Sequence, residues 1–200
     1  MGQLITYHFT LNSPWSYLGD RRLSEMAVRH GATVVHKPTN FSLVFPETGG
    51  LPLPKRAPAR KAYRLQELER WRTYLGIPLI KNPNNFPSNE RDGIGMVIAA
   101  INDGLDVSDL VNAIMTALWA EDRNIGDEAT LINIANAQGL DGQGLLAAGR
   151  DDAIEAQWLQ NSKDALTAGV FGAPTYALGK QLFWGQDRLE FLDRALDASE

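Results

Sequence analysis

The chain of 200 residues contains no cysteine and only three histidines. Without cysteine it can form no disulfide, no thiolate nucleophile and no zinc–thiolate site, so any thiol chemistry requires a thiol from a bound ligand. The three histidines, His8, His30 and His36, are scattered and do not have the spacing of metal ligands. We therefore expect no metal site, and structural roles for the histidines.

Long apolar runs and an excess of positive charge are also missing. No run approaches the ~20 residues of a membrane span, and the N-terminus lacks the apolar core of a signal peptide. The net charge of −5 argues against a general nucleic-acid binder. With 44% hydrophobic residues, the chain can bury one good core, or form a compact domain with a large insertion. We expect a cytoplasmic protein that binds neither membrane nor nucleic acid.

A strand-to-helix junction near the N-terminus carries the first candidate site. Residues 4–10 favour a strand and residues 14–29 favour a helix, with Ser13 as the N-cap and Pro14 at the first helical position. The free N–H groups and the positive dipole end of such a helix favour an anion. Ser16 lies one turn further on, and we expect its hydroxyl to bond to the helix backbone.

The order of the remaining segments predicts the fold. A β-rich run at 33–37 follows the first helix, and the proline-rich stretch 38–58 indicates a long loop. Residues 58–168 keep helical spacing and predict an all-helical block. Two short β-rich runs, 176–178 and 181–184, precede a closing helix. This is the order of the thioredoxin fold, an α/β fold, with a large all-helical insertion between its βαβ and ββα halves.

The same order defines the expected domains. We expect a thioredoxin-like domain of residues 1–57 and 169–200, and an inserted helical domain of residues 58–168. In the thioredoxin fold the first helix begins with Cys-x-x-Cys. Here Ser13 and Ser16 occupy that spacing, so the redox pair is absent.

A second candidate site lies at the start of the predicted ββα half, at Ala173 and Pro174. We expect the Ala173–Pro174 bond to be cis, because cis peptide bonds belong almost entirely to X-Pro. Pro174 lacks an N–H, which suits the first residue of a strand. A cis bond would turn the backbone N–H and C=O of Ala173 toward the cleft, where they could pair with an extended ligand backbone.

Seven basic residues against two acidic ones lie between Lys55 and Arg72, around a helix predicted from Pro58 to about Leu75. Basic side chains outnumber acidic ones there, in a protein that is acidic overall. Such a run is most often a solvated helix face. The functional alternative is a receiver for a small carboxylate, because Arg60 and Arg64, four residues apart, repel one another unless solvent or an anion screens them.

Several motifs together resemble one family. They are residues 13–18 (Ser-Pro-Trp-Ser-Tyr-Leu), Arg70-Trp71, Gly76-Ile77-Pro78, Phe86-Pro87, residues 170–175 (Val-Phe-Gly-Ala-Pro-Thr) and residues 184–189 (Trp-Gly-Gln-Asp-Arg-Leu). Over residues 4–197 the chain is similar to the 2-hydroxychromene-2-carboxylate isomerases, relatives of kappa-class glutathione transferases and of DsbA-type oxidoreductases. The resemblance implies that glutathione binds in the cleft and that an aromatic-catabolism intermediate is isomerised.

The resemblance also implies roles for particular residues. Ser13 would be catalytic, because its hydroxyl is a poor nucleophile without a base but a good hydrogen-bond donor to a thiolate at the helix N-terminus. The glutathione site would comprise Ser13, Pro14, Trp15, Ala173, Pro174, Trp184, Gln186, Asp187 and Arg188. The aromatic carboxylate substrate would meet Arg60, Lys61, Arg64 and Asn85.

Asp187 admits two interpretations. Asp187-x-x-Glu190 is a variant of the capping box, and the same carboxylate could bind the amino end of glutathione. Thr10 and Gly50 depart from the family pattern, in which many members have an acidic residue and an asparagine at these places.

The implied reaction converts 2-hydroxychromene-2-carboxylate to trans-o-hydroxybenzylidenepyruvate. The thiol would add to the conjugated system, allow rotation and depart, which is covalent catalysis with a cofactor as nucleophile. One alternative is a kappa-class-like glutathione transferase or peroxidase that acts on other electrophiles. A second is a non-catalytic thioredoxin-like module that binds a peptide along the edge beside Pro174. Relatives make a homodimer the expected assembly.

Overall fold

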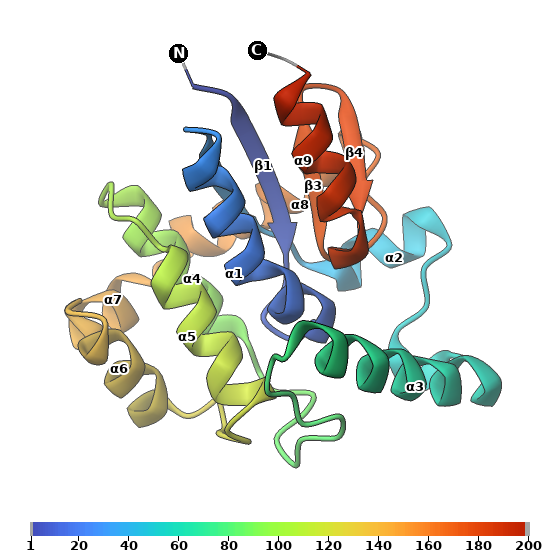
Figure 1. Ribbon diagram of the computed structural model, residues 1–200. Helices are drawn as coiled ribbons and strands as arrows, with labels where there is room; N and C mark the ends of the chain where they lie inside the picture. The colour runs from blue at the N-terminus through green and yellow to red at the C-terminus, as the bar shows by residue number, and fades with distance from the viewer. Residues whose placement is uncertain (1, 199–200) are drawn as a thin grey trace.

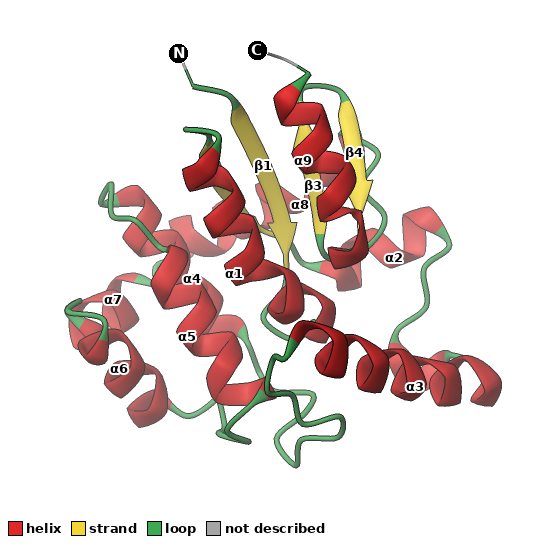
Figure 2. Cartoon of the chain, in the orientation of Figure 1, coloured by secondary structure: helices red, strands yellow, loops and turns green. Residues whose placement is uncertain are grey.

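The computed structural model describes residues 2–198, which form a four-stranded sheet surrounded by helices (Figures 1 and 2). The strands are β1 (Leu4–Phe9), β2 (Thr33–Pro38), β3 (Thr175–Leu178) and β4 (Gln181–Trp184). The helices are α1 (Pro14–Arg29), α2 (Phe41–Thr48), α3 (Pro58–Leu75), α4 (Arg91–Asn102), α5 (Ser108–Trp119), α6 (Glu128–Ala137), α7 (Gly142–Ala148), α8 (Asp152–Thr167) and α9 (Leu189–Asp197), with short 3-10 turns η1 (Leu53–Lys55) and η2 (Gln186–Arg188). Within residues 2–198, no helix combines the length and the apolarity needed to cross a bilayer.

The sheet has the strand order β2-β1-β3-β4. β1 is parallel to β2 and antiparallel to β3, and β4 is antiparallel to β3. The alternate residues Ile5, Tyr7 and Phe9 of β1 are fully buried, as expected for a central strand covered on its faces. The segment from α3 to α8 lies between β2 and β3 in the chain, which confirms the predicted thioredoxin-like α/β fold with a helical insertion.

Helices cover both faces of the sheet. In Figure 1, α1 and α9 lie in front of it and α8 lies behind it, and contacts of α8 with β2 and of α9 with β3 and β4 agree with this view. α4 to α7 gather at one side, and α3 runs across the end of the molecule where β1 passes into α1. Buried side chains of the sheet and of α4 to α6 belong to one continuous core.

The stretch between β2 and α3 is not the long loop that its prolines predicted. It contains α2, which begins at the N-cap Asn40, whose side chain accepts a hydrogen bond from the backbone N–H of Ser42 at 3.0 Å. Phe41 and Val44 are buried in a small core of their own together with Ala165 of α8. The prediction was therefore wrong, because packing against α8 stabilises a short helix that shows little periodicity in the sequence.

The predicted helix ends and the predicted cis bond are present. α3 begins with Pro58 and ends at Gly76, whose φ of 66° is the left-handed conformation favoured at a helix C-terminus. The Ala173–Pro174 bond is cis, which confirms the prediction. The Phe86–Pro87 bond is also cis, and the sequence did not predict this.

Candidate active site

The junction between β1 and α1 has the predicted cap. The Ser13 hydroxyl accepts a hydrogen bond from the backbone N–H of Ser16 at 3.1 Å, and Pro14 is the first helical residue. The Ser13 N–H donates to the Thr10 carbonyl at 3.2 Å. The first turn of α1 holds no acidic residue that would neutralise the positive helix end. Ser13 is 7% exposed, so an anion bound there would be largely shielded from water.

One turn further along α1, Ser16 does not play the role that the sequence suggested. Its side chain is fully buried and, within residues 2–198, forms no bond to the helix backbone, so that prediction is wrong. Its hydroxyl instead interacts with the hydroxyl of Tyr7, which also interacts with the carboxyl of Asp20. Together with the buried hydroxyl of Tyr176, whose ring stacks on that of Tyr7, these groups form a polar patch in the core.

Asp20 lies one further turn along the same helix face and is 2% exposed. Burial raises the pKa of its carboxyl to about 7, and a hydrogen bond from Asn112 Nδ2 at 3.1 Å opposes the rise. This buried acid was not predicted, because aspartate in a helix is normally exposed.

The predicted C-terminal site lies at the same end of the sheet as Ser13. β1 and β3 are antiparallel and pair His8 with Thr175, so the residue before Thr175 lies beside the end of β1. That residue is Pro174, whose carbonyl accepts the N–H of Gly185 at 2.8 Å. Two distant segments of the chain therefore meet at this end, as the fold predicted.

An aromatic pair stands next to Pro174. Trp184 is 52% exposed, and its ring lies edge-on to that of Phe171 with centroids 4.7 Å apart. A Cβ at Gly172 would lie 2.3 Å from Trp184 Nε1, so only glycine allows the indole to come this close. Trp184 was predicted for the glutathione site, whereas Phe171 was not singled out despite its place in the motif.

The three predicted residues of η2 have different surroundings. Gln186 is 1% exposed, and its side chain accepts a hydrogen bond from Arg22 Nη1 at 2.6 Å, so it holds η2 against α1. Asp187 and Arg188 are partly exposed and form an ion pair at 3.5 Å. The N-cap of α9 is Arg188, and the start of this helix has no side-chain cap. The capping-box interpretation of Asp187 is therefore wrong, and its carboxylate is not used by the helix.

Arg64 stands out among the predicted substrate residues. Its guanidinium lies 5.8 Å from the centre of the Phe86 ring, and Phe86 lies 4.9 Å from the ring of Trp119. The Trp119 indole donates a hydrogen bond to the Leu11 carbonyl at 3.1 Å, two residues before Ser13. Arg64 is thus linked to the junction through two aromatic side chains.

The charge of Arg64 has no counterion within the described chain. Arg64 is half-buried, and among residues 2–198 no carboxylate lies within ion-pair distance of it. Burial, together with the positive charge of Arg56, lowers its pKa to about 10. Buried charges are normally paired, so this arrangement favours an anionic ligand.

The other predicted substrate residues make local contacts. Lys61 Nζ donates to the Pro54 carbonyl at 2.8 Å, and Asn85 Nδ2 donates to the Asp122 carbonyl at 2.6 Å. Arg60 is exposed at the start of α3. Trp15 is half-buried against the main core, and Pro14 is buried.

Glu90 was not predicted. It is the N-cap residue of α4, and its carboxylate accepts hydrogen bonds from Thr10 Oγ1 at 2.7 and 2.6 Å and from the Asn12 backbone N–H at 3.1 Å. The only local signal was a polar residue directly before an apolar helix, which does not reveal a partner 80 residues away.

The histidines have structural contacts. His8 and His36 are buried in the sheet, and burial lowers the pKa of each to about 4. His30 Nε2 lies 2.7 Å from an Asp193 oxygen and ties the end of α1 to α9.

Known proteins share this architecture. The chain is 28% identical over 198 residues to the 2-hydroxychromene-2-carboxylate isomerase of Sphingobium xenophagum, with 98% of this chain and 99% of that relative covered. The isomerase of the same name from Pseudomonas putida is 27% identical over 197 residues, with 96% and 94% covered. A solved 2-hydroxychromene-2-carboxylate isomerase superposes with a TM-score of 0.83 at 28% identity, covering 98% of this chain and 95% of that one.

The family described as DsbA-like thioredoxin domain matches residues 4–197, nearly the whole chain. This match and the relatives above confirm the resemblance that the sequence motifs indicated. The chain belongs to the DsbA-like thioredoxin domain family and is similar over almost its whole length to two 2-hydroxychromene-2-carboxylate isomerases.

Proposed function

We propose that this protein is a glutathione-dependent isomerase that converts 2-hydroxychromene-2-carboxylate, or a related aromatic-catabolism intermediate, to the ring-opened trans product. The observation that carries the proposal is Ser13 at the N-terminus of α1 in a chain without cysteine. This position offers a hydrogen-bond donor and a positive helix end but no thiol. The names of the relatives support an isomerase rather than a disulfide oxidoreductase.

The residues present fit glutathione. Among residues 2–198, the Ser13 hydroxyl accepts a hydrogen bond and donates none, so its hydrogen is available to a thiolate. Asp187 has a carboxylate that no helix uses, which suits the ammonium end of the tripeptide. Trp184 adds an exposed apolar surface beside Pro174. When bound, glutathione would supply the nucleophile that adds to the conjugated double bond and leaves after rotation.

The chain would bind and orient the substrate from the other side. Arg64 would receive the substrate carboxylate, because its half-buried charge has no counterion within the described chain. Phe86, under the Arg64 guanidinium, would contact the aromatic ring of the substrate. Ser13 would hold the sulfur at the end of α1 with its hydroxyl hydrogen.

The direct test is product analysis with 2-hydroxychromene-2-carboxylate in the presence and absence of glutathione. We expect conversion to the trans isomer only when glutathione is present. Glutathione binding without isomerisation, but with conjugation of other electrophiles, would favour the transferase alternative. Absence of glutathione binding would leave only a non-catalytic thioredoxin-like module.

Ser13→Ala tests the residue that carries the proposal. The variant should lose most of the glutathione-dependent turnover and remain folded, because loss of an N-cap costs only about 0.5–2 kcal/mol. The matched control is Asp127→Ala, which removes the N-cap of α6, where Asp127 accepts the Thr130 N–H at 2.8 Å. The control should lose similar stability and keep its turnover. Near-normal turnover in folded Ser13→Ala would remove Ser13 from the mechanism.

A further inference from the structure

A carboxylate without an assigned role lies beside the junction. Both oxygens of Glu90 accept from the Thr10 hydroxyl, at 2.7 and 2.6 Å, and one also accepts the Asn12 N–H at 3.1 Å. The Thr10 carbonyl in turn accepts the Ser13 N–H at 3.2 Å. Glu90 is therefore hydrogen-bonded directly to Thr10 and Asn12, two of the three residues that connect β1 to Ser13.

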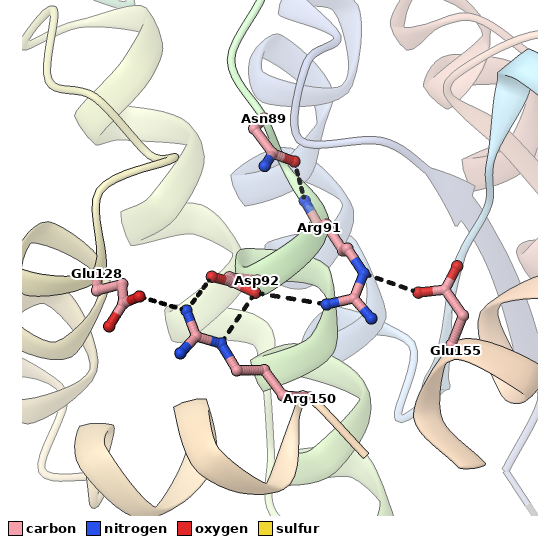
Figure 3. A network of polar contacts seen from close by, with 6 residues as sticks. All are labelled: Asn89, Arg91, Asp92, Glu128, Arg150 and Glu155. Carbon is pink, nitrogen blue, oxygen red and sulfur yellow. Dashed lines mark hydrogen bonds and ion pairs between the residues drawn. The ribbon is translucent and has the colours of Figure 1, made fainter. Parts of the chain in front are cut away.

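The position of Glu90 is held from both sides. Asn12 Nδ2 donates to the Ser88 carbonyl at 2.9 Å, and the Ser88 N–H donates back to Asn12 Oδ1 at 3.0 Å. On the other side, the ion pairs shown in Figure 3 anchor the first turn of α4: Arg91–Glu155, Arg91–Asp92, Arg150–Asp92 and Arg150–Glu128. The charged neighbours of Glu90 are thus paired with one another, and within residues 2–198 no basic side chain forms an ion pair with Glu90.

Among the side chains of the described chain that are hydrogen-bonded to residues 10–13, Glu90 is the one that can accept a proton. Ser13 can donate to a sulfur atom but is too weak a base to take its proton. Residues 10–13 contain no histidine and no acid. Burial raises the pKa of the Glu90 carboxyl above its ordinary value, against the opposing effect of the Thr10 and Asn12 hydrogen bonds. A carboxylate of raised pKa takes up a proton more readily than an exposed one.

We propose that Glu90 is the acceptor for the thiol proton of glutathione and that the Thr10 hydroxyl relays it. Thr10 Oγ1 takes the proton from sulfur and passes its own hydrogen to a Glu90 oxygen, while the sulfur keeps the electron pair of the broken S–H bond. One proton moves, the carboxylate becomes a carboxylic acid, and nothing is oxidised or reduced. The transfer reverses when the thiol is restored. This inference rests on the proposed function.

The test compares the wild type with Glu90→Gln, a substitution of nearly equal shape that cannot accept the proton. Glutathione is titrated into each protein by calorimetry at neutral pH in two buffers of different ionisation enthalpy, and the ultraviolet absorbance of the thiolate is followed in parallel. In the wild type, thiolate should form without proton release to the buffer. In Glu90→Gln, thiolate should either fail to form or form with release of one proton, and turnover should fall about 100-fold or more.

A second pair of variants tests the relay and decides the matter if Glu90→Gln does not fold. Thr10→Val keeps the shape of the side chain and removes the hydroxyl, and it should show the same loss of internal proton transfer. Thr10→Ser keeps the hydroxyl and should restore the internal proton transfer that Thr10→Val loses. Proton release by the wild type, or thiolate formation without release in Thr10→Val or Glu90→Gln, would overturn the inference.

The outcomes separate this inference from the proposed function. Suppose that the wild type binds glutathione and isomerises the substrate, and that Glu90→Gln and Thr10→Val release the same number of protons to the buffer as the wild type. Then the proposed role of Glu90 is wrong and the proposed function stands. If the wild type does not bind glutathione, the proposed function falls and the inference falls with it.

Discussion

The guanidinium of Arg64 is half-buried against Phe86 and has no carboxylate partner in the described chain. Arg64→Gln should therefore raise the KM for a carboxylate substrate about tenfold or more, because a hydrogen bond to a charged group contributes about 1.5–3 kcal/mol. Glutathione affinity should change little. Steady-state kinetics and glutathione titration measure the two effects.

Arg70→Gln is the control for this substitution. Arg70 lies on the same helix and is exposed, where it pairs with Glu67, so its loss should leave both constants near normal. If Arg64→Gln weakens the binding of glutathione and of substrate equally, or changes the binding of neither, the positive stretch of α3 is a solvated helix face.

At Asp187, removal of the charge tests whether the carboxylate binds the amino group of glutathione. Because α9 begins without a contribution from Asp187, Asp187→Asn should leave the free energy of unfolding nearly unchanged. Loss of a charge pair with the glutathione amino group should weaken binding about tenfold, on the order of 1.4 kcal/mol. Calorimetric titration measures the affinity. Glu190→Gln, which removes an exposed charge in the first turn of α9, should bind normally. Unchanged affinity in Asp187→Asn would exclude this carboxylate from the glutathione site.

At the scale of elements, α4 and the end of α7 meet through backbone atoms. A Cβ at Gly95 would lie 2.3 Å from the Gly149 carbonyl oxygen. Gly95→Ala should therefore destabilise the protein by about 1–3 kcal/mol, although alanine favours a helix, because backbone cannot move aside as a side-chain tip can. Urea unfolding followed by circular dichroism measures the change.

Gly93 offers the comparison on the same helix. A Cβ there would meet the tips of the Leu11 and Leu131 side chains at 3.0 and 3.4 Å, which can shift. Gly93→Ala should lower the free energy of unfolding clearly less than Gly95→Ala does. Equal costs would mean that the approach of the two backbones does not decide how these helices pack.

For the whole molecule, Asp20 links stability to pH. Its pKa of about 7 in the fold lies above the ordinary value of about 4, chiefly because of burial. Between these values the folded chain holds a proton that the unfolded chain has lost. The stability that this group contributes is present in full below about pH 4 and is lost as the pH rises to about 7, by about 1.4 kcal/mol per unit.

Asp20→Asn removes this dependence, because the amide cannot ionise. The variant should gain stability relative to the wild type as the pH rises from about 4 to about 7, and the difference should level off above that range. Urea unfolding at several pH values measures it. Asp103→Asn, at an exposed position, should show no such trend. Parallel curves for Asp20→Asn and the wild type would contradict a titrating Asp20.

Part of the fold follows from local signals in the sequence. N-caps at Ser13 and Asp127, and the helix stop at Gly76, involve residues within one or two turns of each other. The thioredoxin-like order of elements followed from the succession of segments, and the cis bond before Thr175 followed from an X-Pro pair at the start of a predicted strand. The capping-box interpretation of Asp187 failed, because η2 shifts the start of α9 to the next residue.

Local patterns and composition were enough to predict the thioredoxin-like order of elements, the serine at the start of α1 and the absence of a thiol. Caps and periodicity act over a few residues, and composition is a property of the chain alone. Which distant side chains meet became known from the folded chain. Glu90 reaches Thr10 across 80 residues, and Arg64 reaches the junction through Phe86 and Trp119. Such contacts depend on how the helical block packs against the sheet. The spacing of residues along one helix does not indicate this packing.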